Sequence, residues 1–215
     1  MKTDIYNYRF EIFLLSQLGI LFGSLLFPFE SFDTVFSPLL FLINLFAGIL
    51  LTHNKPRLKK ILIGIITCSV IVIGIQIAVP DLDLALLRIT INFLFYLLVT
   101  FELVTQVWKA RIVNTNVIAG LISGYISLGF IGYFICMSIE ILNPNSFSGF
   151  SPDLAMGDQI MYYAYITLLT IGYGDILPVT SIAQKAAVFI GLMGQMYLVV
   201  ITAIVVGKYI NQVSD

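Results

Sequence analysis

Long apolar stretches alternate with short polar segments along the whole sequence. A helix needs about 20 mostly apolar residues to cross the roughly 30 Å hydrocarbon core of a bilayer, and six of the stretches approach or exceed that length. They cover residues 10–27, 35–51, 61–79, 84–107, 118–142 and 182–206. The pattern predicts an all-α, multi-pass membrane protein with six transmembrane helices.

A seventh apolar segment, residues 156–169, lies between the fifth and sixth stretches and is too short and too interrupted to cross a bilayer. We expect it to form a re-entrant helix that is followed directly by a loop of extended backbone. Such a loop is tolerated at membrane depth only where protein or a water-filled cavity surrounds it.

The charged residues predict the orientation, because basic residues concentrate in cytoplasmic loops. Six crossings would place one set of basic residues on the same side: Lys2, Arg9, Lys55, Arg57, Lys59, Lys60, Lys109, Arg111 and Lys208. The other side would carry Glu30, Asp33, Asp81, Asp83, Asp153 and Asp175, with Lys185 as its only clear basic residue. We therefore expect a cell-membrane protein with both termini in the cytoplasm and a re-entrant segment that enters from outside.

Composition supports a membrane protein and narrows its chemistry. Of the 215 residues, 59% are hydrophobic and 11% are charged, whereas soluble domains carry about 25% charged residues. The sequence contains no nucleophile–base pair, metal-ligand spacing or phosphate-binding loop. We expect no enzymatic activity, no cofactor and no nucleic-acid partner.

The motif TIGYGD, residues 170–175, follows the short segment directly. A cation that loses its water needs replacement oxygens, and successive backbone carbonyls can supply them where glycine permits unusual backbone angles. Gly172 and Gly174 alternate with Tyr173, whose ring could pack outward and hold the strand. Gly-Tyr-Gly-Asp also makes a surface turn, so the position between two predicted spanning helices, on the external side, is what favours an ion-binding strand.

Residues 161–178, MYYAYITLLTIGYGDILP, resemble the pore signature of potassium channels. The resemblance extends over about residues 117–207, and the layout is similar to small bacterial six-helix ion-channel proteins. It implies a pore domain at 113–215, with outer helix, pore helix, selectivity filter and inner helix. Residues 1–112 would then be a peripheral four-helix domain in the position of a voltage sensor.

The resemblance also implies roles for single residues and an assembly. The selectivity filter for K⁺, the permeant ion, would comprise Thr170, Ile171, Gly172, Tyr173 and Gly174. Asp175 would bond to a pore-helix side chain, here Tyr162, and Tyr163 would also brace the filter. Gly194 would be the inner-helix hinge, and candidates for the cavity wall are Gln195, Leu198 and Thr202. One chain supplies one filter strand, so the resemblance implies a homotetramer in the lipid bilayer.

Some sequence features leave alternatives open. Leu169-Thr170 replaces the two threonines that many potassium channels carry, which affects the packing below the filter. The small residues Gly120, Ser123, Gly124, Ser127 and Gly132 would let helices pack closely, within one subunit or between subunits. Residues 205–209 could narrow the inner mouth as a hydrophobic gate or simply face lipid.

The fourth stretch lacks the repeated basic residues of a voltage sensor. It carries Arg88 near its outer end, which we expect to extend toward water near Asp81 and Asp83. With one charge per subunit, we expect weak or absent voltage dependence. Glu102 lies about 21 Å further along the helix and either pairs with a basic residue such as Lys109 or senses pH.

The sequence thus predicts a potassium-selective channel subunit that conducts K⁺ passively. Two alternatives are a nonselective cation channel and a non-conducting regulatory subunit of a channel complex. Ion selectivity would separate the first alternative, and currents from the purified protein alone would separate the second.

Overall fold

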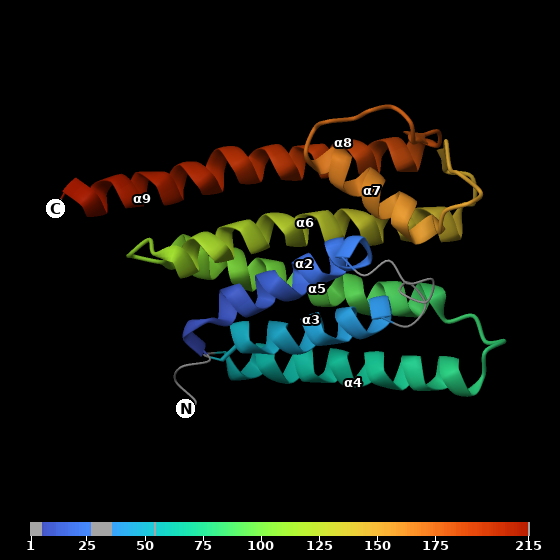
Figure 1. Ribbon diagram of the computed structural model, residues 1–215, viewed down its shortest axis with the longest axis horizontal. Coiled ribbons are helices and arrows are strands. Elements are labelled where there is room, and N and C mark those ends of the chain that lie inside the picture. The colour runs from blue at the N-terminus through green and yellow to red at the C-terminus, as the bar shows by residue number, and fades with distance from the viewer. Residues whose placement is uncertain (1–5, 27–35, 54, 215) are drawn as a thin grey trace.

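The computed structural model describes residues 6–26, 36–53 and 55–214, and all seven predicted apolar segments are helical in it (Figure 1). Lys2, Glu30 and Asp33, which contributed to the predicted orientation, lie outside the described residues. The first helices are α2 (Arg9–Leu26), α3 (Ser37–Leu51), α4 (Pro56–Ala78) and α5 (Ala85–Lys109). They are followed by α6 (Thr115–Leu142), α7 (Met156–Leu168), α8 (Ser181–Met196), the π-helical segment η2 (Tyr197–Ile201) and α9 (Thr202–Ser214). Two short strands, β1 (Phe147–Ser148) and β2 (Leu177–Pro178), flank α7 and its loop.

In the described part of the chain, four helices are long and apolar enough to cross a membrane. They are Pro56–Ala78, Ala85–Lys109, Thr115–Leu142 and Ser181–Gln212. Pro38–Leu51, in α3, is a shorter apolar helix, and α2 is not among the four. The fold is that of an all-α, multi-pass membrane protein, and the count of six crossings stays a prediction.

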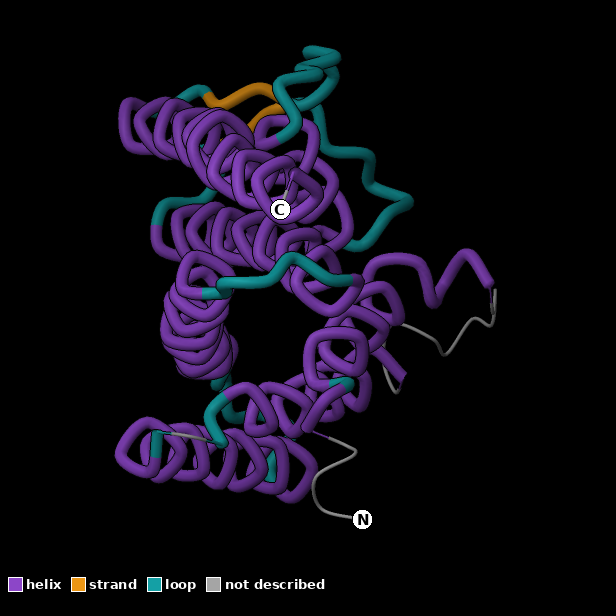
Figure 2. Tube along the Cα trace, turned by 90° about the vertical axis from the view of Figure 1, so that its left-hand side faces the viewer, coloured by secondary structure: helices purple, strands orange, loops and turns teal. Residues whose placement is uncertain are grey.

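The helices lie roughly along one direction, so the connecting segments gather at two ends (Figure 1). The α3–α4 and α5–α6 connections, the start of α2 and the end of α9 share one end, and the α4–α5 and α6–α7 connections share the other. Seen along the bundle, α4 and the last helix lie at opposite edges, with α5 and α6 between them (Figure 2). The basic connections therefore lie at one end, as the charge pattern predicts.

Buried polar side chains join the first helices to α6. The Gln17 amide donates to the Ser127 hydroxyl at 2.7 Å and accepts from the Ser123 hydroxyl at 2.6 Å, and all three side chains are fully buried. A second chain runs from the Tyr96 hydroxyl to the Asn44 amide at 2.6 Å and from that amide to Ser16 at 2.8 Å. Because lipid offers no hydrogen bonds, these pairs fix how α2, α3, α5 and α6 meet.

The small residues of α6 receive side chains from the same subunit. A Cβ at Gly124 would overlap the Tyr197 hydroxyl, and one at Gly129 would overlap the Tyr165 ring. Both hydroxyls then donate to α6 carbonyls, Tyr197 to Leu121 at 2.7 Å and Tyr165 to Ile126 at 2.8 Å. The close packing that the sequence left open at Gly124 is therefore used within one subunit, and Gly129, which the sequence analysis did not name, is used in the same way.

The last helix continues beyond the apolar stretch that the sequence marked as ending at residue 206. The Lys208 ammonium group donates to the Trp108 and Ala110 carbonyls, and the Gln212 side chain accepts from the Val113 amide at 2.8 Å. These bonds fix the polar end of α9 against the α5–α6 connection, which explains why the helix does not stop at Gly207.

We expect Gly129→Ala to destabilise the protein and Gly64→Ala not to. Ala favours a helix over Gly by about 1 kcal/mol, but the added methyl group at position 129 would displace the Tyr165 ring at a cost of about 1–3 kcal/mol. Gly64 lies on exposed α4 with no atom near its missing Cβ. Thermal unfolding of the purified variants, with size-exclusion chromatography as the readout of folded protein, measures the difference in melting temperature. Equal melting temperatures for the two variants would show that Tyr165 does not need this space.

Candidate functional site

Helix α7 is positioned at its start by its own side chains. The Gln159 amide accepts from the Ser151 amide at 2.6 Å and donates to the Ser151 and Leu154 carbonyls, both at 3.0 Å. Asp158 lies in the first turn, where a carboxylate favours the positive end of the helix dipole. The connection before α7 is thus held by a buried glutamine that the sequence analysis did not single out.

The loop after α7 has an unusual and regular backbone. Thr170, Gly172 and Gly174 have φ angles of 58°, 55° and 80°, whereas Ile171 and Tyr173 between them have no positive φ. The amides of Ile171 and Gly172 both donate to the Ile166 carbonyl, at 2.9 and 3.3 Å. Glycine adopts left-handed backbone with little strain, whereas another residue loses about 1–2 kcal/mol there. Thr170 therefore carries backbone strain, which the sequence analysis did not predict.

The outer end of this loop is tied to the segment after α6. Strands β1 and β2 pair antiparallel, and the Val179 amide donates to the Ser146 carbonyl at 2.9 Å. Gly149, with φ 94°, leaves room for the Asp175 carbonyl, which a Cβ would overlap. This end of the loop is therefore fixed by backbone contacts.

Glu140 organises that segment and was missed by the sequence analysis. Its carboxylate is 8% exposed and accepts from the amides of Asn145, Ser146 and Phe147 at 2.8, 3.0 and 3.2 Å. The available signal was a carboxylate near the end of an apolar stretch with no basic residue nearby. Such a group needs backbone N–H donors when it is buried.

Tyr162 and Asp175 form the hydrogen bond that the resemblance implied, at 2.7 Å between the hydroxyl and Oδ2. This bond lowers the pKa of the Asp175 carboxyl below its ordinary value of 3.8; desolvation opposes the shift, and the amides of Asp175 and Ile176 add to it. Tyr163 is instead buried against Phe147, with ring centroids 5.0 Å apart. The two neighbouring tyrosines thus contact different parts of the subunit, and their support of a filter stays a prediction.

The inner end of the loop contacts the outer and inner helices. The Tyr125 hydroxyl donates to the Leu168 carbonyl at 3.2 Å, and Gly194 is buried where a Cβ would overlap that same carbonyl. The Gln195 amide lies 3.5 Å from the Thr170 hydroxyl. Gly194 therefore has a packing reason to be glycine, whereas a role as hinge stays a prediction; the π-helical segment begins three residues later.

Several apolar side chains of the site are open in the single subunit. Leu169 is 46% exposed, Ile171 48% and Tyr173 72%. On the last helix Gln195 and Leu198 are exposed and Thr202 is half-buried. The predicted filter and cavity residues thus lie on a surface that one subunit does not cover.

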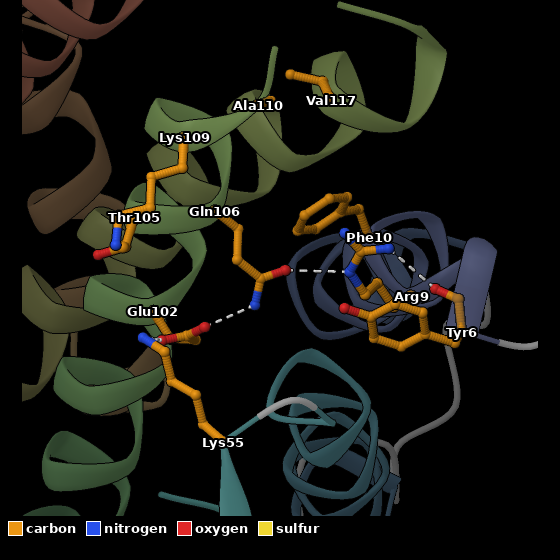
Figure 3. Close-up of a pocket in the computed structure, with 10 residues that line it drawn as sticks. All are labelled: Tyr6, Arg9, Phe10, Lys55, Glu102, Thr105, Gln106, Lys109, Ala110 and Val117. Atoms are coloured by element: carbon orange, nitrogen blue, oxygen red, sulfur yellow. Dashed lines mark hydrogen bonds and ion pairs between the residues drawn. The ribbon is translucent and has the colours of Figure 1, made fainter. Parts of the chain in front are cut away.

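Two charged residues outside the loop have neighbours that the sequence analysis did not name. Glu102 is paired with Lys55, at 2.5 Å, and not with Lys109 (Figure 3). Arg88 forms no ion pair with Asp81 or Asp83 in the part of the chain that is described; it lines a pocket of about 230 Å³ together with Asp158 and Asn92. Asp83 instead accepts from the Ala85 amide at 3.0 Å, at the start of α5.

Residues 120–211 match a protein-family model described as an ion channel. The matched region begins within α6 and ends within α9, so it contains α7 and its loop, and it covers less than half of the 215 residues. No curated protein and no solved structure matched the chain.

The lowered pKa of Asp175 predicts that its hydrogen bond with Tyr162 stabilises the folded protein in a pH-dependent way. Because the folded-state pKa is lowered, the carboxylate contributes stability that is complete above the unfolded-state pKa and is lost as the pH falls through the folded-state pKa. The wild type should therefore be more stable than Tyr162→Phe at neutral pH, and the difference should shrink once the pH falls below 3.8. Thermal unfolding of both proteins across the acidic range measures this.

Tyr209→Phe is the matched control, since Tyr209 is 51% exposed on α9 and remote in sequence from the loop. A stability difference between wild type and Tyr162→Phe that stays constant across the acidic range would contradict the assigned role of the hydrogen bond.

Proposed function

We propose that this protein is a potassium-selective channel subunit that conducts K⁺ passively through a tetrameric pore. The observation that carries the proposal is the left-handed backbone at Thr170, Gly172 and Gly174, at every second residue of a loop within the region that matches the ion-channel model. In a regular strand, neighbouring peptide groups point to opposite sides. A reversal of hand at every second residue removes that alternation, so successive carbonyls can share one side.

A row of carbonyls on one side suits a cation that has lost its water. In potassium channels such carbonyls replace the hydration shell of the ion. The amides of Ile171 and Gly172 donate to Ile166, so these two amides do not occupy carbonyls of the loop itself. Two glycines at left-handed positions keep the strain of this backbone low.

A tetramer would account for the open surface of the single subunit. One strand cannot surround an ion, and a closed ring needs copies related by rotation. The exposed Leu169, Ile171 and Tyr173 side chains would then pack against neighbouring subunits. Irregular backbone at membrane depth needs such a surrounding of protein or a water-filled cavity.

The reversal potential of the purified protein in a planar bilayer tests selectivity under opposed gradients of potassium and sodium. We expect a value near the potassium equilibrium potential. Gly172→Ala should abolish selective current, because alanine resists the φ of 55°. Gly74→Ala is the matched control, since nothing lies within 4 Å of its missing Cβ.

A reversal potential near zero in the wild type would favour a nonselective cation channel. Silence of the purified protein, with current restored by a second protein, would favour a regulatory subunit.

Voltage dependence should be weak, because α5 carries Arg88 as its only basic residue before Lys109 at its end. One charge that crosses 100 mV gains about 2.3 kcal/mol, so four copies supply too little for a steep response. Arg88→Gln should leave the slope of the conductance–voltage curve unchanged. A steep wild-type curve that flattens in Arg88→Gln would show that this residue moves in the field.

A further inference from the structure

A pocket of about 340 Å³ with charged residues in its lining (Figure 3) lies at the bundle end where the basic connections gather (Figure 1). Its walls come from the start of α2, the last turns of α5 and the α3–α4 connection. Its charged lining residues are Arg9, Lys55, Glu102 and Lys109, and its polar lining residues are Tyr6, Thr105 and Gln106. This pocket shares no lining residue with the proposed filter or with the pocket that Arg88 and Asp158 line.

The one carboxylate among these lining residues is already occupied. Glu102 is 3% exposed; its Oε2 pairs with Lys55 and its Oε1 accepts from Gln106 at 2.8 Å. Gln106 also donates to the Leu51 carbonyl at 2.6 Å and accepts from Arg9 Nε at 3.1 Å. Glu102 is therefore satisfied by two of its neighbours, and no other carboxylate lines the pocket among the described residues.

The basic side chains exceed that carboxylate by two. Arg9 is held in place by its bond to Gln106, by the Tyr6 carbonyl at 3.1 Å and by the Tyr6 and Phe10 rings, each 4.2 Å from Cζ. Lys109 has no hydrogen bond or ion pair within the described part of the chain, and it is exposed at the pocket wall. Arg9 and Lys109 line the same pocket, and their excess of positive charge suits an anion.

We propose that this pocket binds a phosphate group, presented by an anionic lipid or by a soluble phosphate ester. A guanidinium plane matches the oxygens of phosphate, and an ammonium adds a point charge. Basic pockets between helices near a membrane surface suit lipid headgroups, and 340 Å³ is at the lower end of the range for small-molecule sites. The site stands on its own charges and does not rest on potassium selectivity.

The test counts molecules bound to the full-length protein by native mass spectrometry in a neutral detergent. The two probes are dioctanoyl phosphatidate and glycerol 3-phosphate, which share a phosphate monoester and differ in their acyl chains; dioctanoyl phosphatidylcholine is the zwitterionic control. Binding of phosphatidate alone identifies a lipid source, and comparable binding of both probes identifies a soluble source. Binding of neither phosphate probe overturns the proposal, and so does equal binding of phosphatidylcholine.

Variants locate the binding and separate it from general surface charge. Arg9→Gln and Lys109→Gln should each weaken phosphate binding about tenfold, since each removes a charged donor. Glu102→Gln should strengthen it, because it removes the only carboxylate that lines the pocket in the described residues and frees Lys55. Lys60→Gln is the matched control, since Lys60 is exposed on α4 and does not line the pocket.

Glu102→Gln is expected to strengthen phosphate binding and Arg9→Gln to weaken it, so the test distinguishes an effect of charge from misfolding. A variant that merely loosens the network would weaken binding whichever charge it removed. Equal weakening by Glu102→Gln and Arg9→Gln would therefore assign the network a structural role only. Equal weakening by Lys60→Gln and Lys109→Gln would assign the binding to the surface and overturn the pocket.

Discussion

Backbone without a helical hydrogen-bond ladder has to be held by its neighbours, and this constraint organises the region that matches the ion-channel model. The loop after α7 is tied at its inner end to α7, where Ile166 accepts two of its amides. At its outer end, β2 pairs with β1, and Glu140 fixes the start of that strand through three amides. The loop therefore keeps an alternating backbone that its own residues could not maintain alone.

Helix α6 is the element on which the other parts meet. Its glycines admit aromatic rings from α7 and from the last helix, and its carbonyls accept their hydroxyls. Its opposite side receives Gln17 through two serines. Small residues in a membrane helix permit close approach, and here each approach ends in a hydrogen bond that fixes the depth of the contact.

Apolar length predicted the six longer helices because a helix in lipid needs a long apolar run, whereas α7 was predicted from a shorter apolar segment. The TIGYGD motif located the irregular loop because glycines tolerate left-handed backbone. The sequence did not predict the partner of Glu102. Pairing with a basic residue was one of the two alternatives, with Lys109 as the example, whereas the partner is Lys55, from a connection 47 residues earlier in the chain. The sequence did not predict the role of Glu140, because its partners are backbone amides, which every residue type except proline carries. It did not predict the left-handed backbone at Thr170, because that conformation was expected only at glycine. The roles of Gly194, Gln195, Leu198 and Thr202 depend on neighbouring copies, which a single chain cannot reveal.

The matching of glycine to tyrosine on α6 has an evolutionary consequence. A larger side chain fits at position 124 only if the side chain at position 197 is smaller than tyrosine, and the same holds for positions 129 and 165. Each pair joins residues that are distant along the chain, so a lone change at either partner leaves an overlap or an empty space. Homologues of this chain should therefore inherit these positions in correlated pairs, with a lost tyrosine accompanied by a larger residue where the glycine stood.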